Sequence, residues 1–183
     1  GKSRFSGESG YFIPIFLHNA SNYDFKLIVK YFSNRFASKD ISVIASNTEK
    51  FIGFQIGNLR FLDSFKFVGA SLDALTQNLL KSGEDKFQIT KNAFPGSSTV
   101  FRKGIYPYEY MNSYSRFSET ELPPQSAFYS QLNDHHITDE EYQLAQAAWT
   151  EFECKTMKNY HDFYLKLDVA LLADVFENFR AIS

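Results

Sequence analysis

Hydrophobic positions along the chain recur at two spacings, one typical of strands and one typical of helices. Near the start, a continuous apolar run has the length of a buried strand. Pro14 within it cannot donate a backbone hydrogen bond, which argues against pairing on both edges. Two later apolar segments are separated by Gly57-Asn58, a pair typical of the tight turn of a β-hairpin. The predicted strands are residues 11–17, 41–44, 51–56 and 59–65.

Apolar residues at helical spacing, together with polar residues that suit helix ends, predict four helices. Ser71 is a suitable N-cap, and Thr138 with Glu141 forms the Ser/Thr-x-x-Glu pattern of a capping box. The order of elements is strand, helix, strand, hairpin, helix, irregular segment and two helices. It predicts an α/β fold, with a small mixed sheet flanked by helices. The predicted helices are residues 23–32, 72–83, 138–154 and 157–180.

The composition is that of a folded domain. Hydrophobic residues make up 44% and charged residues 22% of 183, which excludes wholesale disorder. Residues 1–10 read as a polar tail and residues 11–183 as one domain. The chain has a single cysteine, Cys154, which excludes a disulfide framework and favours a reducing intracellular compartment, in the nucleus, the cytoplasm or a virus-infected cell. No apolar run has the length of a membrane span, and no signal peptide opens the sequence, so we expect neither a membrane protein nor a secreted one.

Charge is distributed unevenly along the chain. The formal net charge of −2 argues weakly against a nucleic-acid-binding protein. Residues 117–154, however, contain eight acidic side chains and no Lys or Arg, which leaves 19 Lys and Arg against 13 acidic residues elsewhere, a balance of +6. We therefore expect an acidic helical insertion at about 117–154 on a mildly basic body, which is compatible with binding a phosphate backbone on one face.

Three segments carry side chains suited to chemistry. Asp24 lies where the first strand passes into the first helix, the kind of position at which open α/β sheets bind ligands. Tyr164 and Asp168 are four residues apart on the last predicted helix and so share one of its faces. Asp63 ends the hairpin. Two of these segments have an ordinary alternative, because Asn19 and Asp24 can serve as helix caps and Asp168 as a solvated carboxylate.

In their order, these segments resemble motifs of family B DNA polymerases. Asn19-x-x-x-Tyr23-Asp24 resembles the second exonuclease motif and Tyr164-x-x-x-Asp168 the third. Asp63-Ser64-Phe65 is similar to the Ser/Thr-Leu motif of the protein-primed branch, and Lys103 and Tyr108 have the spacing of that branch's Lys and Tyr. The resemblance spans residues 13–180 and is closest to viral, transposon and Maverick/Polinton-like sequences.

The resemblance implies an RNase H-like fold and a 3′–5′ exonuclease that proofreads during DNA replication. Such enzymes use two ions, Mg²⁺ or Mn²⁺, about 4 Å apart. It implies that Asp24 and Asp168 hold metal, that the Tyr164 hydroxyl orients the attacking water, and that Lys103 contacts the scissile phosphate with Tyr108 beside it. The residues it implies for holding single-stranded DNA or a primer terminus are His18, Asn19, Tyr23, Ser64 and Phe65.

The sequence also departs from that family. Its first exonuclease motif is Asp-x-Glu on the first strand, whereas the only match here is Asp139-Glu140-Glu141, which is better explained by the helix cap. The chain ends soon after the third motif, so we expect an N-terminally truncated domain without a polymerase domain and without activity in isolation. The alternative is a domesticated, non-enzymatic module that binds DNA or protein. A missing strand would expose a sheet edge, to be covered by the remainder of a polymerase, a protein partner or a second copy.

Overall fold

The structure, a computed structural model, describes residues 11–20, 24–33, 41–47, 50–131 and 134–182. These residues fall into two compact units, residues 1–71 and residues 72–183, which are treated one at a time below. Tyr23, predicted to hold DNA, lies outside the described residues. Together the units contain a mixed four-stranded sheet and helices, so the predicted α/β class is confirmed.

The first unit is built on the sheet, whose strand order is β1-β4-β3-β2. Strand β1 (Ile13–Leu17) pairs in parallel with β4 (Leu59–Asp63), while β3 (Lys50–Ile56) is antiparallel to both β4 and β2 (Ile41–Asn47). All four predicted strands are confirmed, with small changes in their bounds. Because β1 and β4 are parallel neighbours, their carboxyl ends meet at the same edge of the sheet.

Two details of this sheet follow from single residues. Strand β1 lies at one end of the strand order, which agrees with the argument from Pro14. The β3–β4 hairpin turns at Gly57 and Asn58, as predicted, and Gly57 has the positive φ of 54° that such a turn requires. Within β3, Gly53 allows close approach, since a Cβ there would lie 2.0 Å from the carbonyl oxygen of Phe61.

Helix α1 (Asp24–Ser33) and the sheet share an aromatic core. The buried ring of Phe54 stacks on that of Phe61, with centroids 4.7 Å apart, and Phe25 of α1 meets Phe54 edge to face at 5.1 Å. Such ring pairs contribute about 1 kcal/mol beyond the area that they bury. The first unit therefore uses phenylalanine where many sheets use aliphatic side chains.

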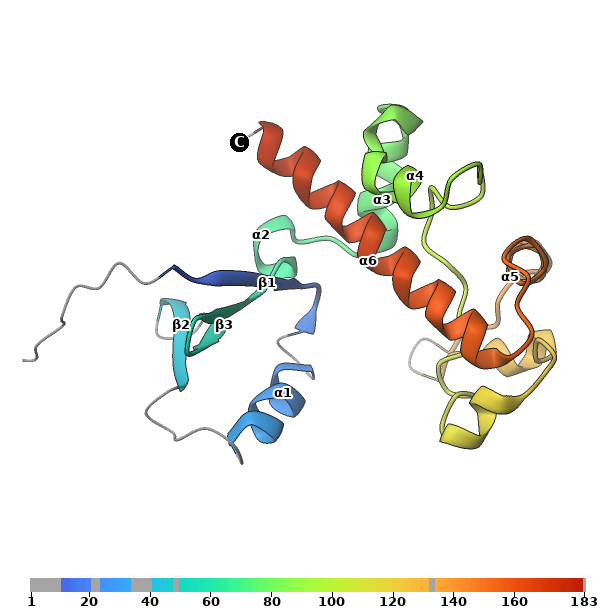
Figure 1. The fold of residues 1–183 in the computed structure, drawn as a ribbon, viewed down its shortest axis with the longest axis horizontal. Helices are drawn as coiled ribbons and strands as arrows, with labels where there is room; N and C mark the ends of the chain where they lie inside the picture. Colours follow the sequence, from blue (N-terminus) through green and yellow to red (C-terminus); the bar gives the residue numbers. More distant parts are fainter. Residues whose placement is uncertain (1–10, 21–23, 34–40, 48–49, 132–133, 183) are drawn as a thin grey trace, which may run out of the picture. The chain divides into compact units, whose positions relative to one another are not determined.

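The second unit is organised around α6 (Met157–Ile182), the long predicted helix. Figure 1 shows α3 (Leu72–Leu80) and α4 (Gln88–Ala93) beside one part of α6, with α5 (Asp139–Glu151) near its N-terminal end. None of the helices among the described residues is long and apolar enough to cross a membrane. The short helical segments are α2 (Phe65–Val68), in the first unit, and η3 (Glu84–Lys86), η4 (Tyr114–Ser118) and η5 (Gln125–Phe128), in the second.

Polar side chains fix the starts of two helices in the second unit. The capping box predicted for α5 is present, because Thr138 accepts from the amide of Glu141 while the Glu141 side chain accepts from the amide of Thr138. At α4, the buried carboxylate of Asp174 on α6 accepts from the amides of Ile89 and Thr90, each at 2.8 Å. This second cap joins residues that are far apart in sequence, and no sequence pattern indicated it.

Candidate functional site

The candidate residues of the first unit gather where β1 and β4 end. The amide and the hydroxyl of Ser64 both donate to the carbonyl oxygen of Leu17, at 2.8 Å and 2.9 Å. Nδ1 of His18 lies 3.0 Å from the Ser64 hydroxyl, and the His18 ring meets Phe65 edge to face at 5.6 Å. The structure therefore brings together His18, Ser64 and Phe65, which the sequence placed in two separate motifs.

Asp63 fixes the backbone around this group. It is fully buried, and its Oδ1 accepts from the amide of Asn19 at 2.8 Å and from the amide of Phe65 at 3.1 Å. Asn19 itself adopts φ of 58°, a left-handed conformation that asparagine tolerates better than most residues. Sequence reasoning placed Asp63 at the end of the hairpin but did not identify this role.

Asp24 occupies a different kind of position. It is the first residue of α1 and is exposed to solvent. A carboxylate in the first turn of a helix is stabilised by the helix dipole and the free amides there. Asp24 therefore has two interpretations. It can stabilise the start of α1, or it can bind metal as predicted.

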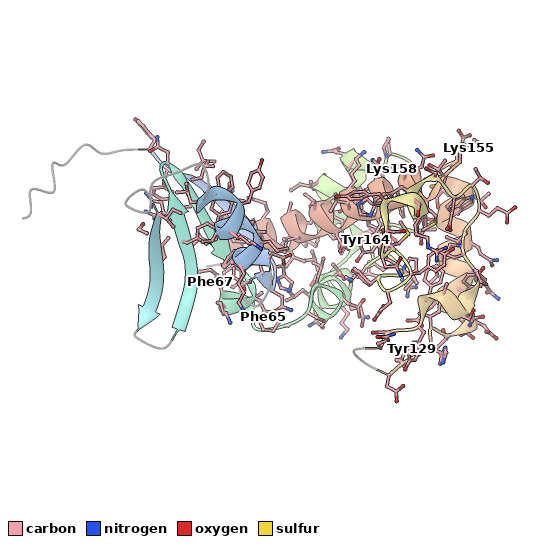
Figure 2. All side chains as sticks on the ribbon, turned by 90° about the horizontal axis from the view of Figure 1, so that it is seen from below. Phe65, Phe67, Tyr129, Lys155, Lys158 and Tyr164 are labelled. Carbon is pink, nitrogen blue, oxygen red and sulfur yellow. The ribbon has the colours of Figure 1, made fainter. Side chains whose placement is uncertain are left out.

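In the second unit, three predicted residues converge on one another. The Lys103 ammonium donates to the hydroxyl of Tyr164 at 2.9 Å and to the hydroxyl of Tyr108 at 3.3 Å. The two hydroxyls are also hydrogen-bonded to each other. None of the ion pairs among the described residues involves Lys103, whose ammonium instead donates to two phenol hydroxyls. We call Lys103, Tyr108 and Tyr164 the lysine–tyrosine cluster; Figure 2 labels Tyr164.

Tyr164 keeps its proton in this cluster. Burial raises the pKa of the Tyr164 hydroxyl most strongly, and the charge of Asp168, one turn further along α6, raises that pKa again. A neutral phenol can both accept a hydrogen bond from Lys103 and donate one, which an ionised phenolate cannot do. Tyr164 is therefore suited to orienting a polar group rather than to serving as an anionic ligand.

Tyr106, to which the sequence assigned no role, supports both phenols of the cluster. Its ring stacks on Tyr164 at 4.6 Å and meets Tyr108 edge to face at 5.2 Å. Its hydroxyl is hydrogen-bonded to Nδ1 of His161 at 2.6 Å, and burial together with Tyr108 raises its pKa to about 12. The one available signal was the position of Tyr106 inside the Lys103–Tyr108 motif.

Gly104 is also part of this packing. A Cβ at this position would lie 2.9 Å from Cδ2 of Tyr164, closer than real Cβ contacts allow. The absence of a side chain at Gly104 thus lets the backbone next to Lys103 approach the Tyr164 ring.

The predicted metal ligands do not form a complete set within either unit. Asp24 belongs to the first unit and Asp168 to the second. Among the described residues, no group of three histidine, cysteine, aspartate or glutamate side chains is arranged to hold a metal ion. Asp63, the other acidic residue near the strand ends, already uses one oxygen for two backbone amides. As described, each unit alone does not fit a two-metal centre.

Comparison with known proteins tests whether the chain belongs to the family that its motifs resemble. Residues 12–183 match the family described as DNA polymerase type B, organellar and viral. No curated protein and no solved structure matches the chain. The matched range includes every predicted site residue, and it confirms the resemblance inferred from the motifs. DNA polymerases generally use divalent metal ions. The chain belongs to the organellar and viral family of type B DNA polymerases.

Proposed function

We propose that this chain is the exonuclease domain of a type B polymerase and that it holds the frayed 3′ end of a DNA strand during proofreading. The observation that carries the proposal is the lysine–tyrosine cluster, in which an ammonium without a carboxylate partner among the described residues lies beside Tyr108, whose ring is 58% exposed. The proposed fold is RNase H-like, and the parallel β1–β4 pair beside an antiparallel hairpin supports it.

The cluster matches the two features common to all single-stranded DNA. An ammonium neutralises one phosphate of the backbone, which makes binding depend on salt. An exposed ring stacks on a base of any kind, with a contribution of about 1–3 kcal/mol. Neither interaction reads sequence, and a proofreading domain must accept every terminal nucleotide.

The strand ends of the first unit form a second candidate binding group, which is considered by itself. His18 and Phe65 present an imidazole and a phenyl ring within 5.6 Å of each other, at the carboxyl ends of two parallel strands. Such ends are where open α/β sheets bind ligands. We infer that these rings offer a stacking surface for a base, with Ser64 and the Asn19 backbone shaping its edge.

For the isolated chain we propose binding without hydrolysis. The sequence has no Asp-x-Glu other than the one at the start of α5, so it lacks the two carboxylates that the resemblance assigns to the first exonuclease motif. Asp24 and Asp168 would then be the ligands left for Mg²⁺ or Mn²⁺, and Mg²⁺ bound through so few carboxylates keeps most of its water. Both leaving and attacking oxygens need metal stabilisation in a two-metal mechanism.

A second candidate function is that of a non-enzymatic module that binds another protein chain. Strand β1 lies at the sheet edge, and Tyr11, Phe12 and Ile13 at its start are all exposed. An edge strand with exposed apolar side chains is a site for pairing with a further strand. Light scattering that shows a concentration-dependent oligomer, together with no DNA binding, would favour this function over the first.

Fluorescence anisotropy with a labelled single-stranded oligonucleotide tests the leading proposal. We expect salt-dependent binding without sequence preference, and Lys103→Ala should weaken it about tenfold. Lys81→Ala is the control, because Lys81 is an exposed lysine of the same unit whose ammonium donates to the side chain of Asn78 and not to a tyrosine hydroxyl. Equal affinities for wild type, Lys103→Ala and Lys81→Ala would refute the proposal.

A further inference from the structure

A line of aromatic rings continues from the lysine–tyrosine cluster towards η4. Beyond Tyr108, the centroid of Tyr106 lies 5.2 Å away, and that of His161 lies a further 5.5 Å from Tyr106. Phe117 meets His161 edge to face at 5.0 Å, and Tyr114 lies 6.3 Å from Phe117. We call these five side chains the ring track. All belong to the second unit, so their arrangement does not depend on the first.

The two ends of the ring track are open to solvent. Tyr108 is 58% exposed and Tyr114 is 91% exposed, while Tyr106, His161 and Phe117 between them are half-buried. The packing of the second unit does not account for a tyrosine as exposed as Tyr114. An exposed large apolar surface next to a functional site commonly marks a binding surface.

A basic side chain lies at each end of the ring track, Lys103 beside Tyr108 and Arg116 between Tyr114 and Phe117, which favours an anionic partner over an apolar one. Lys103 stands at one end and forms no ion pair with the described residues. The acidic neighbour of His161 is Asp162, which Lys158 neutralises in an i,i+4 pair. Figure 2 shows Lys155 together with Lys158 at the N-terminal end of α6. Glu119 is likewise paired with Arg116, while Glu109, next to Tyr108, accepts from the amide of Gln131.

We propose that the ring track binds single-stranded nucleic acid, specifically the nucleotides on the 5′ side of the terminal nucleotides held at Lys103. Every base has a face that stacks without regard to sequence, and Tyr108 and Tyr114, at the two ends of the track, are its members exposed for such stacking. This inference rests on the proposed function for the position of the 3′ end, and it adds the path that the strand follows beyond that end.

Binding of oligothymidylates of two lengths tests the ring track separately from the end site. A trinucleotide can occupy only the end site, whereas an oligonucleotide of about nine nucleotides also reaches Tyr114. We expect the longer strand to bind at least tenfold more tightly, and Tyr114→Ala to remove most of that gain without changing trinucleotide binding. Tyr114→Ala should fold normally because its ring is 91% exposed. Tyr31→Ala, which removes another exposed ring, on α1, is the control and should leave both affinities unchanged.

The outcomes separate the two proposals. If the trinucleotide binds and the longer strand binds no more tightly, the ring track is wrong while the end site stands. The ring track is equally wrong if Tyr114→Ala and Tyr31→Ala behave alike. If the trinucleotide does not bind but the longer strand does, and Tyr114→Ala abolishes that binding, the end site fails and the ring track stands. Tyr114→Trp should restore the length dependence, since it returns a stacking surface.

Discussion

The backbone amide of Asn19 donates a hydrogen bond of 2.8 Å to the buried carboxylate of Asp63, 44 residues further along the chain. This contact fixes the segment after β1 against the end of β4. The same oxygen accepts from the amide of Phe65, so one carboxylate orders the backbone on both sides. The arrangement of His18, Ser64 and Phe65 therefore depends on a residue that points away from solvent.

Removing the Asp63 carboxylate should destabilise the first unit. Asp63→Ala leaves two amide donors without their acceptor, and we expect the free energy of unfolding to fall by about 2–4 kcal/mol. Asp63→Asn keeps an acceptor oxygen in place and should cost clearly less. Urea denaturation of the three proteins measures the difference. An Asp63→Ala protein as stable as wild type would show that the contact contributes nothing.

Tyr106 should make stability decrease at high pH. Its folded pKa is about 12, against an ordinary value of 10.0, so the unfolded chain loses this proton at lower pH than the folded protein does. The stabilisation is thus complete below pH 10 and is lost as pH rises towards 12. Tyr106→Phe should flatten the fall of stability across that range. An unchanged slope in the variant would exclude Tyr106 as a source.

Gly104→Ala should disturb Tyr164 without unfolding the chain. The added Cβ would lie 2.9 Å from the Tyr164 ring, so the ring or the backbone next to Lys103 must shift. We expect affinity for single-stranded DNA to fall about fivefold to tenfold, since a shifted stacking contact loses about 1 kcal/mol or slightly more and about 1.4 kcal/mol is a factor of ten. The circular dichroism spectrum should stay that of wild type. Wild-type affinity in the variant would mean that the Tyr164 position does not matter for binding.

The isolated chain should not degrade DNA with Mg²⁺ or Mn²⁺. Loss of one metal's stabilisation costs several kcal/mol, and each 1.36 kcal/mol is a factor of about ten in rate. A 5′-labelled single strand incubated with wild type should therefore remain intact over the assay, as it should with the Asp168→Ala control. Stepwise shortening by wild type that disappears in Asp168→Ala would contradict the prediction.

Local patterns predicted most of the fold. The period of the apolar residues indicated the four strands and the long α6, and the capping box located the start of α5. These features depend on residues close together in sequence. Helix α4 was not predicted, because it has only six residues and takes its cap from Asp174, more than eighty positions away. Short elements of this kind depend on packing that a sequence window does not contain.

In the candidate site, too, some contacts could be predicted from the sequence and others could not. Resemblance to polymerase motifs grouped Lys103 with Tyr108 and Tyr164, and the structure places their polar atoms within hydrogen-bonding distance. The support from Tyr106 and His161 depends on which face of α6 meets the segment after Lys103. Neither the spacing nor the composition of the sequence specifies that contact, which depends on how the chain folds.

Photo-crosslinking from the last nucleotide of a strand tests the central claim most directly. A single-stranded oligonucleotide with a 5-iodouracil base at its 3′ end should crosslink to an exposed ring next to Lys103, and peptide mapping should identify Tyr108. The same base at the 5′ end of a strand of about nine nucleotides should give little product at Tyr108, because only the 3′ end is held there. Equal crosslinking to Tyr108 from both ends, or none from the 3′ end, would contradict the account of a site that holds the 3′ terminus.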